Sequence, residues 1–274
     1  MEPCLQHHVT DGIATVVIHN PGKRNALTPG MWRALPPLLE RLAADPAVRA
    51  LVLTGEGDTF SAGADIGALG ATYEETTALA LPAEEALARF PRPTLAAVRG
   101  SCVGGGCQLA TACDLRFAEQ GARFGVTPAR LGIVYAPGST RRLTELVGPA
   151  TTKYLLLSGE LIGTERALRT GLVDEVLPPG GLADRVAEFT RILVSRSALT
   201  QAAAKEFTAG PVEPARLEYW RDQMRDSGET AEGVAAFLER RTPRFRWSPR
   251  EPADAGARVQ AGPARPGPGH TAYR

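Results

Sequence analysis

The chain has 274 residues, and hydrophobic residues make up 43% of them, which is enough for the core of one large domain or two small ones. A net charge of +1 gives no strong field for nucleic acid or an anionic membrane, and no apolar run approaches the roughly 18 residues of a membrane span. The N-terminus has neither the basic start nor the apolar run of a signal peptide, so we expect a cytoplasmic protein.

Apolar runs and helical segments alternate along most of the chain. Runs rich in apolar and β-branched residues predict strands at 13–18, 50–54, 94–98, 114–118 and 172–177. Spacing and capping residues predict helices at 29–44, 74–90, 107–113, 140–146, 151–157 and 164–170, and an almost continuous helical region over 182–241. We expect Pro36 and Pro37 to kink the first helix and Pro82 to interrupt the second.

The cysteines and histidines follow no redox or metal-binding pattern. No pair forms C-x-x-C, and no histidine has a second ligand at helical spacing. We expect buried free thiols, exposed His7 and His8 just before the first strand, and a structural His19. Residues 251–274 are rich in proline and glycine and poor in large apolar residues, which predicts a disordered tail.

Two glycine-rich turns are the most informative stretches of the chain. The first is Phe60–Ile66 and the second is Val98–Ala110, and each follows a predicted buried strand. The order strand, glycine turn, helix aims free backbone N–H groups at an anionic oxygen. Glycine turns are also common between ordinary strands and helices, so either turn alone would indicate no site. Together they could supply one N–H each to an oxyanion hole.

These turns and several later segments resemble the enoyl-CoA hydratase/isomerase (crotonase) superfamily over Val9–Phe245. The matching segments are Asn20–Leu27, Ser61–Ile66, Gly104–Cys107, Ala112–Arg116, Phe124–Gly125 with Leu131–Gly132, Ala167 with Gly171–Asp174, and Glu232–Arg241. The resemblance implies an α/β fold, a crotonase (ClpP-like) ββα superhelix with a C-terminal helical trimerisation domain. It implies a core domain over 1–196 and an oligomerisation domain over 197–250, before the 251–274 tail.

The resemblance also implies where a substrate binds. The oxyanion positions match Ala64 and Gly105, whose N–H groups would stabilise a thioester enolate. The positions expected to contact coenzyme A are Arg24, Ala26, Ala62, Asp65, Ile66 and Arg241. The substrate would be an acyl-CoA or acyl-carrier thioester, with coenzyme A as part of the substrate and no metal or redox cofactor. The partner would be further copies of the chain, in a homotrimer or a dimer of trimers, rather than nucleic acid or a membrane.

The sequence departs from the hydratases of this family at both acid/base positions. Gln108 stands where one glutamate is expected and Pro128 where the other is expected. An amide cannot accept and return a proton as a carboxylate does, so hydration by the usual route is doubtful. The stretch Thr127–Tyr135 instead resembles family decarboxylases that act on malonyl-type thioesters. We therefore expect a decarboxylase or related lyase, with Tyr135, Thr127 and Gln108 as the polar groups of the site.

Two alternatives remain open. The first is an enoyl-CoA hydratase or isomerase with a relocated carboxylate, for which Glu74, Glu75, Glu84 and Glu85 are the first residues to consider. The second is a non-catalytic protein that binds acyl thioesters. Arg141 and Arg142 could attract an acidic substrate, but at a helix start they are expected to be surface charges.

Overall fold

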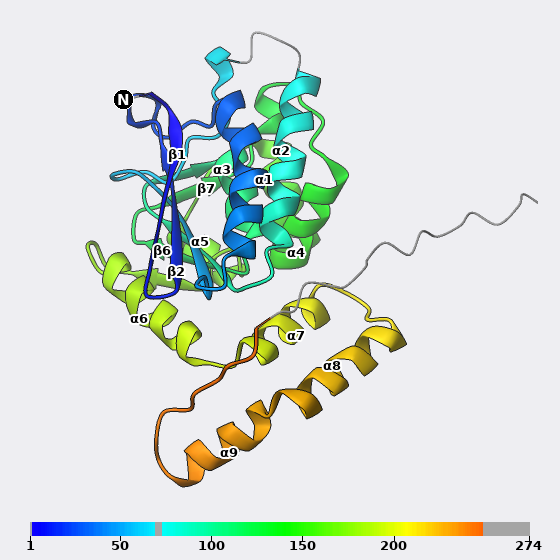
Figure 1. Ribbon diagram of the computed structural model, residues 1–274. Helices are drawn as coiled ribbons and strands as arrows, with labels where there is room; N and C mark the ends of the chain where they lie inside the picture. Colours follow the sequence, from blue (N-terminus) through cyan, green and yellow to red (C-terminus); the bar gives the residue numbers. More distant parts are fainter. Residues whose placement is uncertain (1, 69–72, 249–274) are drawn as a thin grey trace, which may run out of the picture.

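A six-stranded sheet forms the centre of the molecule (Figure 1). The computed structural model describes residues 2–68 and 73–248, with side chains described up to Gly67 and again from Ala78. The strands follow the order β1 (Cys4–Thr10), β2 (Ile13–His19), β3 (Ala50–Gly55), β4 (Thr94–Val98), β6 (Leu115–Glu119) and β9 (Glu175–Leu177). β1 and β2 are antiparallel, and every later pair is parallel.

The expectation that His7 and His8 precede the first strand was wrong. Both lie in β1, which pairs with β2 along its whole length, although both are exposed as expected. β1 has no buried residue, and so its sequence lacks the apolar alternation from which a strand is predicted.

Each inner strand divides its side chains between the two faces of the sheet. Leu51 and Leu53 of β3 belong to the large core, which lies under α1 (Pro29–Ala44), α2 (Tyr73–Ala88) and α3 (Gly105–Ala112). Val52 faces the opposite way and joins a smaller core against α6 (Leu182–Ser195). The ring centroids of Phe117 and Phe189 lie 5.1 Å apart in this second core. The sheet is therefore covered on both faces, as parallel sheets require.

Pro82 does not interrupt the second helix as expected, and the kink expected in the first helix at Pro36 and Pro37 stays a prediction. α1 begins as predicted, because the Thr28 hydroxyl accepts a hydrogen bond from the Met31 N–H at 3.3 Å, but it continues through Pro36 and Pro37. α2 likewise continues through Pro82. An interior proline costs roughly 3 kcal/mol, and burial of the leucine stripe of α1 outweighs that cost. The stripe consists of Leu35, Leu38, Leu39 and Leu42.

The second glycine turn contains a strand that we did not predict. β5 (Ser101–Val103) forms a small sheet with β7 (Arg123–Gly125) and β8 (Ile162–Gly163). α4 (Pro137–Ser158) follows, and Gly148 breaks it into the two predicted helices with φ 73° and ψ 165°. α5 (Thr164–Arg169) then leads to β9.

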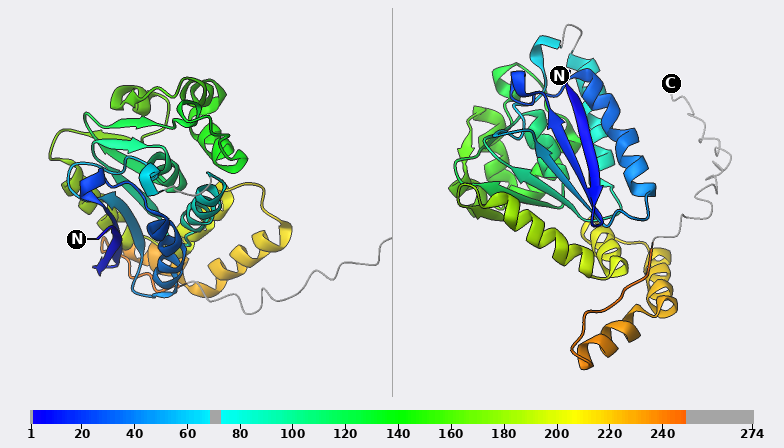
Figure 2. Two further views of the ribbon diagram at one scale, coloured as in Figure 1. Left: turned by 90° about the horizontal axis from the view of Figure 1, so that it is seen from above. Right: turned by 60° about the vertical axis from the view of Figure 1, so that its left-hand side comes forward.

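The C-terminal region is helical, as expected, and consists of α7 (Ala198–Thr208), α8 (Pro214–Ser227) and α9 (Glu229–Leu238). Figure 2 shows α8 and α9 standing out from the body that contains the sheet. The Trp220 ring packs against those of Phe207, Tyr219 and Trp247. Large apolar side chains remain exposed on the two outer helices, namely Leu217, Met224, Val234, Phe237 and Leu238.

The predicted start of the C-terminal region falls at Ser197, whose hydroxyl caps α7. The division into two domains stays a prediction, and the tail predicted for 251–274 lies outside the described residues. Within the described ranges, no helix is both long and apolar enough to cross a membrane.

The expectation of free thiols is confirmed. All four cysteines are free, and Cys102, Cys107 and Cys113 are buried around the second turn. Burial raises the pKa of Cys102 well above its usual range and that of Cys113 to about 12. A hydrogen bond with Cys102 lowers the pKa of Cys107.

Candidate active site

The first glycine turn is held between two neighbouring segments. On one side the Ser61 N–H donates to the Ser101 carbonyl at 2.8 Å, and on the other the Leu27 N–H donates to the Gly63 carbonyl at 2.7 Å. The next bond on the Leu27 side runs from the Asp65 N–H to the Leu27 carbonyl at 2.9 Å. Among the described residues no acceptor is present for the Ala64 N–H, which lies between these anchored positions.

The Asn20–Leu27 segment holds this turn and the residues before it through hydrogen bonds. The Asn25 side-chain amide donates to the carbonyls of Glu56 at 2.8 Å and Thr59 at 2.6 Å. The Arg24 carbonyl accepts from the Ala62 N–H at 2.9 Å, in a left-handed turn with φ 50°. The segment assigned by resemblance to coenzyme A thus also fixes the backbone of the first turn.

The second turn brings Gly105 against the first. Gly105 is the opening residue of α3, so its N–H lies in the helix's first turn, and it too has no acceptor among the described residues. A Cβ on Gly105 would lie 3.5 Å from the Ala64 nitrogen and 2.8 Å from Trp32 Cζ2. A Cβ on Gly63, where φ is +104°, would lie 3.4 Å from the Gly105 nitrogen. Two unpartnered N–H groups therefore meet at the positive end of a helix.

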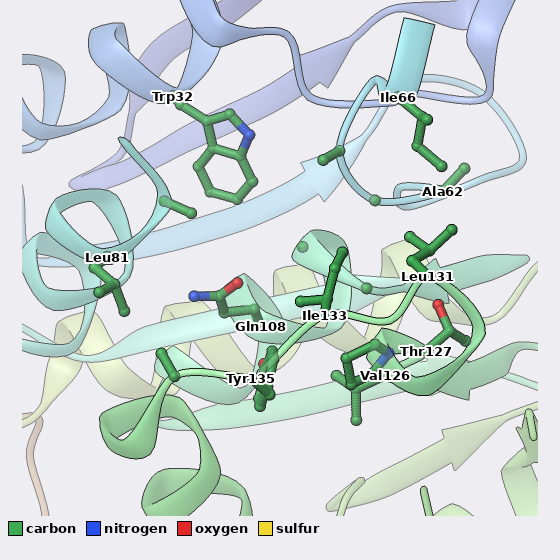
Figure 3. Close-up of a pocket in the computed structure, with 17 residues that line it drawn as sticks. Trp32, Ala62, Ile66, Leu81, Gln108, Val126, Thr127, Leu131, Ile133 and Tyr135 are labelled. Atoms are coloured by element: carbon green, nitrogen blue, oxygen red, sulfur yellow. The ribbon is translucent and has the colours of Figure 1, made fainter. Parts of the chain in front are cut away.

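A cavity of about 140 Å³ opens beside these two N–H groups (Figure 3). Its walls are mostly apolar, with side chains of Trp32, Ile66, Ala80, Leu81, Val126, Pro128, Leu131 and Ile133. Its polar side chains are Gln108, Thr127 and Tyr135. No Asp, Glu, Lys or Arg is among the lining residues that the structure describes.

Most of the predicted site residues line this cavity, and four do not. Those in the lining are Ala62, Ala64, Ile66, Gly105, Gln108, Thr127 and Tyr135. Ala26 is buried, Arg24 is exposed, and Asp65 accepts from Lys23 Nζ at 2.7 Å. Arg241 pairs with Glu232 in a separate hollow of the C-terminal region, which also contains Arg244 and Arg246.

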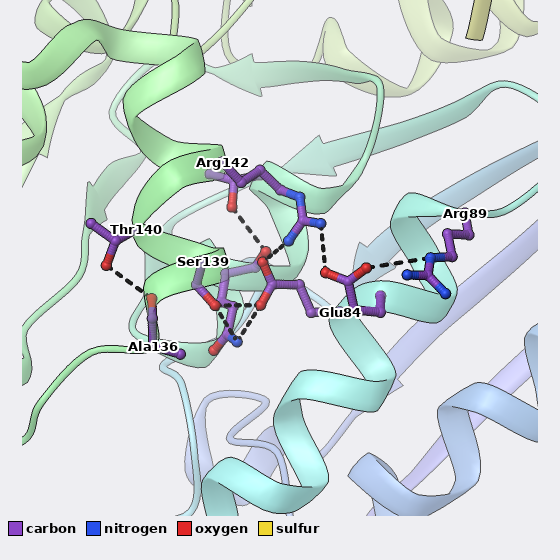
Figure 4. A network of polar contacts seen from close by, with 9 residues as sticks. Glu84, Arg89, Ala136, Ser139, Thr140 and Arg142 are labelled. Carbon is purple, nitrogen blue, oxygen red and sulfur yellow. Dashed lines mark hydrogen bonds and ion pairs between the residues drawn. The ribbon is translucent and has the colours of Figure 1, made fainter. Parts of the chain in front are cut away.

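A buried polar network behind Gln108 was not predicted (Figure 4). The amide nitrogen of Gln108 donates to Glu84 Oε2 at 2.6 Å and to Ser139 Oγ at 3.2 Å. Ser139 Oγ donates in turn to Glu84 Oε2 at 2.5 Å. Arg142 pairs with the other Glu84 oxygen and donates to Glu85 at 2.9 Å. Glu84 is 0% exposed, so the network encloses a buried carboxylate.

The expectation that Arg142 is a surface charge was wrong. Its side chain is 21% exposed and bridges two carboxylates. Burial alone would lower the pKa of Arg142, but the hydrogen bonds and charges of Glu85 and Glu84 outweigh it and raise the pKa. Of the four carboxylates considered first, Glu84 is the one that touches a lining residue, while the side chains of Glu74 and Glu75 lie outside the described part.

The sequence did contain a signal for Glu84. Ala80, Ala83 and Leu87 are buried on α2, and Glu84 falls on the same stripe at helical spacing. A carboxylate on the buried stripe of a helix requires partners, since an unpaired buried charge is costly.

Two N–H groups, one of them at a helix N-terminus, face an apolar cavity, and such an arrangement can bind an anionic oxygen. A family model described as enoyl-CoA hydratase/isomerase matches residues 8–248. The chain belongs to the enoyl-CoA hydratase/isomerase family, so the family predicted from the sequence is confirmed, while the likeness of Thr127–Tyr135 to family decarboxylases stays a prediction.

Curated relatives and solved structures agree with this assignment. The chain is 34% identical over 245 residues to the crotonyl-CoA hydratase of Syntrophomonas wolfei, covering 85% of this chain and 94% of the relative. It is 33% identical over 253 residues to the (E)-benzylidenesuccinyl-CoA hydratase of Thauera aromatica, covering 87% and 97%. A crystal structure of an enoyl-CoA hydratase/isomerase family member matches with a TM-score of 0.84 and 36% identity over 91% of this chain and 99% of that one. The predicted α/β crotonase fold is confirmed.

Proposed function

We propose that the chain decarboxylates a malonyl-type acyl thioester, with the N–H groups of Ala64 and Gly105 stabilising the thioester enolate. Family membership supports an acyl-CoA substrate. The reaction breaks the bond between the α-carbon and the carboxylate, and the electron pair of that bond forms the enolate as carbon dioxide leaves. Water then returns a proton to the α-carbon. No general base is needed.

The observation that carries this proposal is the lining of the cavity. Gln108 and Pro128 line it at the positions where the resemblance leads us to expect the two glutamates, and no carboxylate is among the described lining residues. An apolar wall disfavours the substrate carboxylate more than the transition state, in which charge moves to the two N–H groups. The Tyr135 and Thr127 hydroxyls are the groups in the lining that could orient the carboxylate.

The test compares two reactions of the wild-type protein. Carbon dioxide release from malonyl-CoA and methylmalonyl-CoA should exceed addition of water to crotonyl-CoA, because each missing acid or base contributes about 10²–10⁴-fold to hydration. Efficient hydration without carbon dioxide release would reverse the proposal. Binding of each thioester without any turnover would favour a non-catalytic binding protein.

A second candidate, hydration or isomerisation of an enoyl thioester, is favoured by Glu84. This buried carboxylate lies one hydrogen bond behind the cavity, and the relatives named above are hydratases. Glu84 would reach a substrate only after the Gln108 amide moved aside. For this candidate, Glu84→Gln should abolish hydration of crotonyl-CoA.

We also propose that the substrate carries coenzyme A or a carrier arm, and that the chain forms a homotrimer or a dimer of trimers. Arg24 is exposed next to the first turn, where it could contact phosphates. Arg241 would contribute from a neighbouring subunit. The exposed apolar side chains of α8 and α9 support an assembly through the C-terminal region.

A further inference from the structure

The amide group of Gln108 has a fixed orientation. A side-chain NH₂ has two hydrogens, and here they face Glu84 Oε2 at 2.6 Å and Ser139 Oγ at 3.2 Å. The Ser139 hydroxyl can accept from Gln108 because its own hydrogen is donated to Glu84. Both bonds end on the same oxygen of Glu84, and its other oxygen pairs with Arg142.

The amide oxygen of Gln108 is consequently left for the cavity. Figure 3 shows it on the cavity side of the side chain, facing the space below Trp32. The charged groups around this amide are Glu84 and Glu85 of α2 and Arg142 of α4, while α3 itself carries no charge. The wall at this point therefore presents a hydrogen-bond acceptor.

We propose that Glu84 is a positioning residue, which holds Gln108 as an acceptor and so directs the substrate carboxylate away from Gln108, to the side of the cavity with Tyr135 and Thr127. The second half of this inference rests on the proposed decarboxylation. A carbonyl oxygen repels a carboxylate, whereas an amide N–H would bind it. With its donors occupied, Gln108 cannot hold the carboxylate in the ground state, and the carboxylate remains free to leave.

The test is Glu84→Gln, measured with malonyl-CoA. The new amide at position 84 can donate, so Gln108 is expected to flip, accept from it and turn its own N–H groups to the cavity. Since Arg142 keeps its pair with Glu85, the fold should persist. Both KM and kcat for malonyl-CoA should fall roughly tenfold, because the carboxylate is then bound more tightly in the ground state than in the transition state.

Glu85→Gln is the matched control, because Glu85 pairs with Arg142 but does not touch Gln108. It should leave both constants unchanged. Calorimetry with malonyl-CoA and butyryl-CoA gives a readout that needs no turnover: Glu84→Gln should tighten malonyl-CoA binding and leave butyryl-CoA binding unchanged. If the variant binds malonyl-CoA more tightly but the wild type releases no carbon dioxide, the positioning role of Glu84 is supported and the proposed decarboxylation is rejected.

An unchanged malonyl-CoA affinity in a folded Glu84→Gln protein would overturn the inference, since a purely structural role changes stability alone. If Glu84→Gln does not fold, Glu84→Asp takes its place. It keeps the charge for Arg142 but withdraws the carboxylate from Gln108, and it should tighten malonyl-CoA binding in the same direction. Unchanged affinity in that variant would equally reject the inference.

Discussion

Gly105 combines two properties at one position, a free N–H and the absence of a side chain. Its N–H lies beside that of Ala64, and a Cβ there would come within 2.8 Å of the Trp32 ring. The two properties can be separated by substitution, which makes Gly105 the residue at which the proposed oxyanion hole is best tested.

Gly105→Pro removes the N–H and adds a Cβ, whereas Gly105→Ala adds the Cβ alone. Proline is tolerated at the first position of a helix, so the fold should survive. Loss of the donor should lower kcat about 100-fold or more beyond the effect of Gly105→Ala, as measured by steady-state turnover. Equal rates in the two folded variants would remove this N–H from the mechanism.

Gln108→Glu tests the coupling between positions 84 and 108. It places a second carboxylate where the amide now donates at 2.6 Å, so one carboxylate must bind a proton and its pKa rises. A raised pKa in the folded state means that stability is retained at low pH and lost as pH rises above about 4.3, the ordinary value for glutamate. The melting temperature of this variant should therefore fall as the pH rises from about 5 to about 7.

The double variant Glu84→Gln with Gln108→Glu should recover most of that loss, because it again joins one amide to one carboxylate. Melting curves of the wild type, both single variants and the double variant form the cycle. If the changes in melting temperature of the two single variants simply add in the double variant, the two residues do not interact, which would contradict the network.

Most residues that line the cavity could be predicted from the sequence, but the polar network behind Gln108 could not. Gly105 and Gln108 belong to one short turn that is visible in the sequence, and their proximity to Ala64 is predicted by the resemblance to the family. The bonds of Glu84 join it to Gln108 across 24 residues and to Ser139 across 55. Such pairings depend on how α2, α3 and α4 pack, which no local spacing encodes.

At the scale of elements, glycine and proline had different predictive value. Gly148 correctly indicated a break in α4, because φ 73° with ψ 165° is a conformation that side chains oppose. Pro82 did not indicate a break, and α1 also continues through Pro36 and Pro37, since the packing of α1 and α2 on the sheet outweighs local preference.

Gly148→Ala isolates this backbone effect. No atom lies within 4 Å of the added Cβ, so crowding contributes nothing and the strain of the left-handed conformation remains. We expect the free energy of unfolding to fall by about 1–3 kcal/mol in chemical denaturation. Gly138→Ala is the control in the same helix, because its site is equally open and has no positive φ. It should be neutral or stabilising, and a similar loss in both variants would contradict the strain account.

At the scale of the whole molecule, α8 and α9 leave apolar surface that no other described part of the chain covers. Phe237 is 81% exposed and Leu238 is 74% exposed, in a helix that stands apart from the sheet (Figure 1). Single exposed apolar residues are common, but several on neighbouring helices indicate a protein interface.

Phe237→Glu should dissociate the proposed trimer, because a charge would be buried at the interface. Light scattering coupled to size exclusion would then give the mass of one chain, 29.0 kDa, where the wild type gives a multiple of it. Val9→Glu on β1 is the control and should leave the mass unchanged. A wild type that already elutes as a monomer would reject the assembly.

The three thiols buried around the second turn allow the opening of this region to be followed by chemical modification. Cys102 and Cys107 are 0% exposed and Cys113 is 4% exposed, whereas Cys4 is half-buried. Thiol reagents attack the thiolate, and they need contact with the sulfur. An alkylating reagent that modifies Cys4 promptly can reach the other three only when the region opens. The rate at which these three cysteines are alkylated therefore measures how often the turn that carries Gly105 opens. A bound thioester should lower that rate, and no engineered label is needed to observe it.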